Sequence, residues 1–238
     1  MPSITLPARP APVELDFART AVIVVDMQND FGSKGGMFHR AGIDIETITQ
    51  IVPRIAAVLA AARGAGVPVV YLKQQHAPDL ADAGSVRAPH FIKHQRMQLG
   101  RSVTAPDGSP SRILVADTWN TAIIEALTPE PEDVIVGKHR YSGFFETDLH
   151  ERLLALGVDT LVFVGATTSI CVESTLRDAM FRDYICVALA DCTAEPIAHD
   201  ATRSNHDASL LNIELLLGWV ANSGDLRAAL GGFRQAAE

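Results

Sequence analysis

The sequence lacks any long apolar or basic run. No stretch approaches the roughly 20 consecutive apolar residues that cross a bilayer. The first residues include prolines and lack the basic region and apolar core of a secretory signal. No cluster of Lys or Arg is long enough to follow a phosphate backbone, and the formal net charge is −8. We therefore expect a cytoplasmic protein that binds neither a membrane nor nucleic acid.

Cysteine is also scarce. The three cysteines, Cys171, Cys186 and Cys192, cannot all pair with one another, and an intracellular chain would keep them reduced. Their spacing matches no Cys-x-x-Cys zinc pattern. Cys186 lies in an apolar, strand-like run and is predicted to be a core residue, whereas Cys192 has no predicted role.

What the sequence does contain is a large apolar fraction. Hydrophobic residues make up 47% of the 238, enough for the core of one domain. Residues 1–19 hold four prolines among residues of mixed polarity, which predicts an arm on the surface or on a neighbouring subunit. Residues 20–238 are expected to form a single domain.

Strand-like runs alternate with helical patterns after residue 19. This alternation predicts an α/β fold in which helices cover both faces of a mostly parallel sheet, a Rossmann-like three-layer α/β/α arrangement. The expected strands are 20–25, 67–72, 133–136, 160–164 and 184–190; the expected helices are 46–63, 120–127, 148–156, one that begins at Cys171, and 200–220.

Two segments lack a regular pattern. Residues 32–38 are too rich in glycine for regular structure and could close over a site. Residues 77–119 are irregular, and the Pro-Asp-Gly sequence within 104–112 predicts a turn. His90 and His94 could share a helical face as metal ligands. No pattern places a third ligand, so we expect neither a metal nor another cofactor.

Three chemically active side chains follow predicted strands. Asp26 comes directly after the first strand, Lys138 follows the third, and Cys171 follows the strand 160–164 through a short turn. Each has a structural alternative: a turn-forming Asp, a Lys that reaches solvent, and a small buried thiol. Because parallel strands bring their carboxyl ends to one edge of the sheet, the three are expected to meet there.

Together these groups would form a hydrolytic site. The first turn of a helix and a neighbouring Lys138 would both favour the Cys171 thiolate. Asp26 could take the thiol proton and later pass it to a leaving amine. Backbone N–H groups in the turn 166–171 could stabilise the oxyanion of a tetrahedral intermediate. This arrangement predicts acyl transfer through a cysteine nucleophile.

Three motifs, in their order along the chain, resemble those of the isochorismatase-like cysteine hydrolase superfamily. They are Val24-Val-Asp-Met-Gln-Asn-Asp-Phe31, Lys138, and Gly165-Ala-Thr-Thr-Ser-Ile-Cys171. The resemblance implies an isochorismatase-like hydrolase fold with a triad of Asp26, Lys138 and Cys171. It also implies an oxyanion hole built from the Thr167 and Cys171 amides, a cis peptide before Thr167, and a homo-oligomer, either dimer or tetramer.

Within that superfamily the chain is similar to ureidoacrylate amidohydrolases of pyrimidine degradation and to biuret hydrolases. The implied reaction cleaves a C–N bond of a small ureido or carbamoyl amide and releases ammonia or carbamate. Gln74 and His76 stand where the ureidoacrylate enzymes have Asn and Trp, and the Asp-x-His metal motif of nicotinamidases is absent. The candidate substrate-binding residues are Phe31, Gln74, His76, Tyr141 and Asn212.

Two alternatives remain open at the level of sequence. The substrate could be biuret or an N-carbamoyl amino acid, because both carry a carbamoylated nitrogen. The chain could instead be a non-catalytic binding or redox-sensing protein in which Cys171 is oxidised. The complete set of Asp26, Lys138 and Cys171 favours the enzyme, since a binding protein needs no such set.

Overall fold

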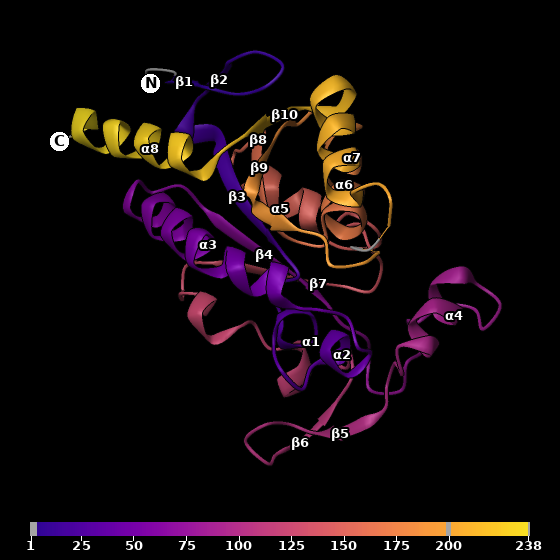
Figure 1. Cartoon of the computed structure of the whole chain (residues 1–238). Helices are drawn as coiled ribbons and strands as arrows, with labels where there is room; N and C mark the ends of the chain where they lie inside the picture. The colour runs from indigo at the N-terminus through magenta and orange to yellow at the C-terminus, as the bar shows by residue number, and fades with distance from the viewer. Residues whose placement is uncertain (1–3, 199–200, 238) are drawn as a thin grey trace.

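A six-stranded sheet forms the centre of the protein. The computed structural model describes residues 4–198 and 201–237. Every pairing within this sheet is parallel, and the strands lie in the order β10-β9-β8-β3-β4-β7. Figure 1 shows the helices on either side of it. The strands are β3 (Thr20–Val25), β4 (Val69–Gln74), β7 (Val134–Lys138), β8 (Thr160–Ala166), β9 (Ile185–Ala194) and β10 (Trp219–Ala221).

The two faces of the sheet bury separate apolar clusters. Along β3, Val22 and Val24 pack into one cluster, whereas Ala21, Ile23 and Val25 pack into the other, as the two-residue period of a strand requires. One face carries α3 (Glu46–Gly64) and α8 (Ser223–Ala237); the other carries α5 (Leu149–Ala155), α6 (Glu173–Met180) and α7 (Asn205–Asn212). The predicted three-layer α/β/α fold is confirmed.

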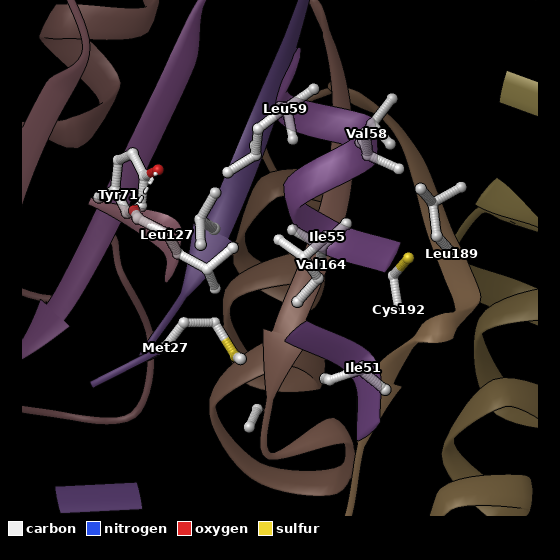
Figure 2. Packing of buried hydrophobic residues seen from close by; sticks show 14 of the residues in the cluster. Met27, Ile51, Ile55, Val58, Leu59, Tyr71, Leu127, Val164, Leu189 and Cys192 are labelled. Atoms are coloured by element: carbon white, nitrogen blue, oxygen red, sulfur yellow. Dashed lines mark hydrogen bonds between the residues drawn. The ribbon is translucent and has the colours of Figure 1, made fainter. Parts of the chain in front are cut away.

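The long helix α3 supplies much of the first cluster. Its buried residues recur at helical spacing, as the sequence predicted. In Figure 2, Ile51, Ile55 and Val58 of α3 face Val164 and Leu189 of the sheet. The side chains of Cys186 and Cys192 are also fully buried, in opposite clusters, so the prediction of a core role for Cys186 is confirmed.

The described part of the predicted N-terminal arm contains a small hairpin. Residues Ile4–Leu6 (β1) and Val13–Leu15 (β2) form an antiparallel hairpin, followed by a 3-10 turn at Phe17–Arg19. Leu6, Leu15 and Phe17 are buried in the cluster that includes α8. Their burial ties this segment to the body of the protein, because each would otherwise expose a large apolar side chain.

The helix predicted over 200–220 is wrong. Residue 200 lies outside the described residues; α7 ends at Asn212, a π-helical turn covers Ile213–Leu217, and β10 follows. Gly218 allows the chain to pass so close to β9 that a Cβ atom there would lie 2.2 Å from the Cys186 carbonyl oxygen. The apolar leucines of this segment made it resemble one continuous helix, although the helix ends before Gly218 and an edge strand follows.

The remaining connections are short elements. The predicted helix at 120–127 is instead two 3-10 turns, Trp119–Thr121 and Glu125–Leu127. The predicted turn within 104–112 is confirmed, because it joins β5 to β6. No helix within the described ranges is long and apolar enough to cross a membrane. The other elements are α1 (Asn29–Gly32), α2 (Met37–Arg40), α4 (Pro89–Arg96), β5 (Ser102–Thr104) and β6 (Pro110–Arg112).

Candidate active site

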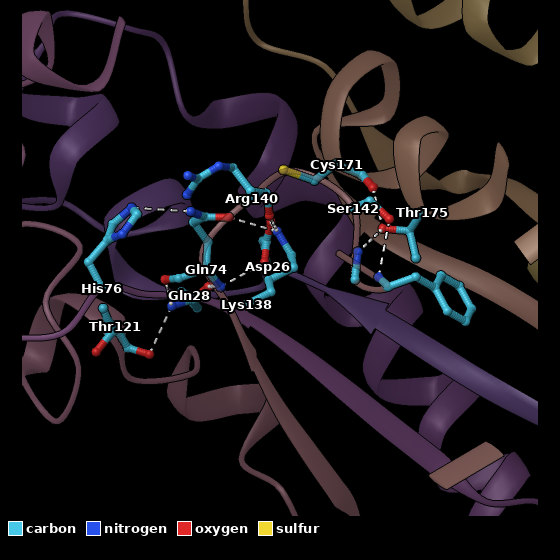
Figure 3. Close-up of polar contacts among 12 residues, drawn as sticks. Asp26, Gln28, Gln74, His76, Thr121, Lys138, Arg140, Ser142, Cys171 and Thr175 are labelled. Carbon is cyan, nitrogen blue, oxygen red and sulfur yellow. Dashed lines mark hydrogen bonds and ion pairs between the residues drawn. The ribbon is translucent and has the colours of Figure 1, made fainter. Parts of the chain in front are cut away.

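The carboxyl ends of β3, β7 and β8 bring the predicted triad together. Asp26 follows β3 and Lys138 ends β7; their side chains are almost completely buried and form an ion pair of 2.8 Å between Nζ and Oδ2. In Figure 3 the sulfur of Cys171 points toward this pair. The expectation that the three side chains meet at one sheet edge is therefore fulfilled by their geometry.

Each N–H of the Lys138 ammonium and each carboxylate oxygen of Asp26 has a hydrogen-bond partner. The Lys138 ammonium has three N–H groups, and it donates to Asp26, to Oε1 of Gln74 at 2.9 Å and to the Arg140 carbonyl oxygen at 3.1 Å. The other Asp26 oxygen accepts from the Gln74 backbone N–H at 2.9 Å. These bonds hold both side chains in place, because breaking one would leave a buried polar group without that partner.

Burial and charge act against each other in this group. Burial raises the pKa of the Asp26 carboxyl, and the Lys138 charge offsets that only in part. Burial alone would lower the pKa of Lys138, but the charge of Asp26 and its hydrogen bond raise it above the ordinary value. A permanent ammonium therefore lies beside a carboxyl that can exchange a proton, the combination that general acid–base catalysis needs.

The turn that carries Cys171 follows a position that requires glycine. Gly165 has a φ of +118°, and a Cβ atom there would lie 2.1 Å from the Val25 carbonyl oxygen of the neighbouring strand. The peptide bond between Ala166 and Thr167 is cis, as the family resemblance implied. A π-helical turn at Thr168–Val172 then leads into α6.

Burial dominates the surroundings of the Cys171 thiol. Cys171 precedes α6 within the π turn and is 7% exposed. Burial raises the pKa of its thiol well above the ordinary value; Lys138 opposes the rise, but Asp26 adds to it. Loss of solvent outweighs both the neighbouring ammonium and the helix end. Together these effects favour the protonated thiol over the thiolate, so a neighbouring base such as Asp26 would assist its reaction.

Two side chains that the sequence analysis did not identify anchor this turn. Glu195 accepts from the backbone N–H of Ser169 at 2.9 Å and from its hydroxyl at 2.6 Å. Oγ1 of Thr168 lies 2.9 Å from Nδ1 of His206. Glu195 could have been identified from its position in the sequence, because it directly follows β9 and therefore lies at the same sheet edge as the triad.

A pocket opens above Cys171. Of the predicted substrate-binding residues, Phe31, Gln74 and Tyr141 line it, and so does the Thr167 residue predicted for the oxyanion hole. His76 is buried behind Gln74, with 3.5 Å between their nearest nitrogens. Asn212 is exposed on α7 and does not line the pocket. Lining residues that the sequence did not predict are Met37, Phe38, Lys93, His94, Met97, Ile170 and Ile197.

The segment 32–38 contributes to this pocket through a short helix. Asp30 anchors this helix through hydrogen bonds. One of its carboxylate oxygens accepts from the Met37 N–H at 2.8 Å, and the other accepts from the Leu114 N–H at 2.7 Å. Burial raises the pKa of Asp30 to about 6, although its hydrogen bonds oppose the rise. The pocket wall therefore rests on a buried carboxyl.

The two histidines considered as metal ligands lie on α4. Their ring centroids are 4.1 Å apart, and Nδ1 of His94 donates to the His90 carbonyl oxygen at 2.8 Å. Burial, as the main cause, lowers the pKa of His90 to about 3 and that of His94 to about 4. Among the residues that the structure describes, no three His, Cys, Asp or Glu side chains are grouped to hold a metal ion.

Comparison with known sequences identifies the family. The model of the isochorismatase domain matches residues 20–225. The ureidoacrylate amidohydrolase RutB of Methylobacterium radiotolerans is 43% identical over 229 residues, which cover 96% of this chain and 86% of the relative. The protein of the same name from Rhizobium rhizogenes is 40% identical over 228 residues, which cover 96% and 90%.

Solved structures agree with this result. A cysteine hydrolase from Pseudomonas syringae pv. phaseolicola is 30% identical with a TM-score of 0.78, and the match covers 98% of this chain and all of that one. N-carbamoylsarcosine amidase from Thermoplasma acidophilum is 27% identical with a TM-score of 0.62, covering 86% and 96%. The chain is thus a hydrolase of non-peptide carbon–nitrogen bonds, as predicted, and it belongs to the isochorismatase family.

Proposed function

We propose that this protein is a cysteine amidohydrolase that cleaves a ureido acid of the ureidoacrylate type. The observation that carries the proposal is the buried Lys138–Asp26 ion pair facing the Cys171 thiol at the base of the pocket. The ureidoacrylate amidohydrolases that match almost the whole chain support the choice of substrate.

In the proposed reaction Asp26 accepts the thiol proton while the Cys171 sulfur attacks the ureido carbonyl carbon. Negative charge then develops on the carbonyl oxygen, and the backbone N–H groups of Thr167 and Cys171 are the proposed donors to it. Lys138 keeps its charge throughout and lowers the energy of the thiolate.

The intermediate collapses when a C–N bond breaks and Asp26 returns the proton to the departing nitrogen. If the terminal nitrogen leaves, ammonia is released and the substituted carbamoyl group remains on sulfur. If the internal nitrogen leaves, an enamine is released and the unsubstituted carbamoyl group remains. Water, deprotonated by Asp26, then attacks the thiocarbamate carbonyl. As the carbon–sulfur bond breaks, Asp26 returns that proton to sulfur and the Cys171 thiol is restored.

The test is ammonia release from ureidoacrylate, because the carbamate product also decomposes to ammonia. Wild type and Cys192→Ala, which alters a buried thiol outside the pocket, should both be active, and Cys171→Ala should be inactive. Intact-mass spectrometry of enzyme quenched during turnover should find the adduct on Cys171, and its mass identifies which bond breaks. Activity that persists in Cys171→Ala would refute the mechanism.

A second candidate substrate is an N-carbamoyl amino acid. It is supported by the similarity to N-carbamoylsarcosine amidase, whose structure covers most of this chain. Biuret and N-carbamoyl amino acids therefore belong in the same assay. Absence of turnover on all of these, together with rapid peroxide oxidation of Cys171, would favour the redox-sensing alternative.

The predicted homo-oligomer remains a proposal. Three leucines at the end of α7 and in the following π turn support it, because they expose 53%, 63% and 80% of their surface: Leu211, Leu215 and Leu216. A monomer rarely leaves such a cluster in water. Analytical ultracentrifugation of wild type and of a Leu215→Ser, Leu216→Ser variant tests this proposal, and a monomeric wild type would contradict it.

A further inference from the structure

A line of polar side chains runs outward from the ion pair. Nζ of Lys138 lies 2.9 Å from Oε1 of Gln74, and Nε2 of Gln74 lies 3.5 Å from Nε2 of His76. Nδ1 of His76 lies 3.0 Å from a carboxylate oxygen of Asp82. The first three side chains are almost completely buried, and Figure 3 shows them in sequence from Lys138 to His76.

The chemistry of the two ends determines every orientation between them. The Lys138 ammonium can only donate, so the Gln74 atom that it contacts is the oxygen. The NH₂ group of Gln74 therefore faces His76, whose Nε2 must accept. That tautomer carries its proton on Nδ1, which donates to the acceptor-only carboxylate of Asp82. The side chain of Gln74 is thus held from both sides.

The main chain of Gln74 is held as well. Its N–H donates to Oε1 of Gln28 at 2.8 Å, and its carbonyl oxygen accepts from Nε2 of Gln28 at 3.0 Å. Gln74 also lines the pocket. Because its oxygen is already committed to Lys138, the polar group that it offers to a substrate is the NH₂ group. This position in the pocket therefore presents a donor.

The charges around this position favour an anionic acceptor. Both nearby carboxylates are engaged, Asp26 by Lys138 and Asp82 by His76 and the Ala77 N–H. Lys93 lines the pocket. In Figure 3, Gln74 lies on the side of the ion pair away from Cys171. A substrate whose reacting carbonyl meets Cys171 would thus present its other end to Gln74.

We propose that Gln74 is the specificity-determining residue that donates to the carboxylate of a ureido acid, and that His76 and Asp82 are positioning residues that hold its amide in the donating orientation. The inference rests on the proposed function and deepens it. A donor at this position selects ureido acids over uncharged carbamoyl compounds such as biuret. His76 itself does not touch the substrate.

The experiment compares ureidoacrylate with its uncharged methyl ester in wild type and two variants of one residue. His76→Gln places an amide oxygen near the former Nε2 and retains an acceptor for Gln74. His76→Asn places its amide near the former Nδ1 and leaves Gln74 without that acceptor. The matched control is His150→Gln. His150 lies on α5, forms a hydrogen bond with the Tyr184 hydroxyl and does not line the pocket.

We expect wild type, His150→Gln and His76→Gln to prefer the acid. His76→Asn should lose roughly 10- to 100-fold in kcat/KM for the acid, mainly through KM, with the ester little changed, because a hydrogen bond to a charged group is lost. An unchanged acid-to-ester ratio in His76→Asn, or an equal loss on both substrates, would overturn the inference.

The proposed function can fail separately. If wild type hydrolyses neither compound, calorimetry decides the inference by measuring how the acid and the ester bind to the same four proteins. Acid binding that weakens in His76→Asn alone would support the role of Gln74 without catalysis. Equal affinity for acid and ester in wild type would overturn it.

Discussion

Nζ of Lys138 lies 2.8 Å from Oδ2 of Asp26, and neither side chain exposes more than 1% of its surface. Removing one partner would leave an uncompensated charge in a buried position. The pair is therefore both a structural requirement and the electrostatic centre of the site. Its two functions can be separated by experiment.

Lys138→Met should abolish detectable turnover and lower the free energy of unfolding by about 3–5 kcal/mol, because it leaves Asp26 buried without a partner. The double variant Asp26→Asn, Lys138→Met should recover part of that stability while remaining inactive. Urea denaturation of wild type, of the single variants Lys138→Met and Asp26→Asn, and of the double variant provides the measurement. A double variant with the summed loss of both single variants would show that the pair is not coupled.

A second prediction concerns the state of the nucleophile. Because burial raises the pKa of the Cys171 thiol, its alkylation by iodoacetamide at pH 7 should be slower than that of an exposed cysteine in a peptide. Intact-mass spectrometry can follow the reaction, and the fully buried Cys186 and Cys192 should not compete in the folded protein. An alkylation rate that reaches its plateau below pH 7 would identify a resting thiolate and contradict this account.

The triad could be predicted because local patterns mark where buried strands end. Asp26 and Lys138 follow or end runs of β-branched residues, and parallel strands share one carboxyl edge. The choice of the Thr167 and Cys171 amides as oxyanion donors, and the cis peptide before Thr167, came from the family resemblance. The same logic could have identified Glu195 after β9, but the predicted strand ended at residue 190, four residues before the observed end.

The charge state and the pocket wall could not be predicted in this way. The resting state of Cys171 depends on how completely the fold removes water, which no local spacing encodes. The role of Asp30 depends on Leu114, 84 positions away in the chain. Asn212 does not line the pocket, because it is the last residue of α7 and its side chain is exposed.

A third prediction uses Asp30, whose pKa is raised to about 6 in the folded protein against 3.8 for an ordinary aspartate. The folded state binds this proton more tightly, so the contribution to stability is fully present below pH 3.8 and is lost as the pH rises through about 6. The shift corresponds to roughly 3 kcal/mol. Asp30→Asn cannot titrate and should lack this component.

The measurement is the difference in unfolding free energy between wild type and Asp30→Asn at several pH values from 4 to 7.5. Taking the difference removes the opposing contribution of His90 and His94, which titrate in both proteins. Wild type should lose stability relative to the variant as the pH rises. A difference that does not change with pH would show that Asp30 keeps an ordinary pKa.

The last prediction tests whether the turn that carries Cys171 needs its anchor. Glu195→Ala removes the acceptor for the Ser169 N–H and hydroxyl, so the turn can shift relative to the ion pair. A shift of about 1 Å in a reacting group can cost roughly 100-fold in rate. We expect kcat to fall about 10- to 100-fold, with a smaller change in KM.

Asp191 offers a matched control. It accepts from the N–H and hydroxyl of Ser223 at 2.8 and 2.6 Å, the same arrangement that Glu195 makes with Ser169, but it does not line the pocket. Asp191→Ala should therefore cost similar stability in urea and leave kcat near the wild-type value. If both variants lose activity in proportion to their lost stability, Glu195 supports the fold in general, and the turn holds the position of Cys171 without it.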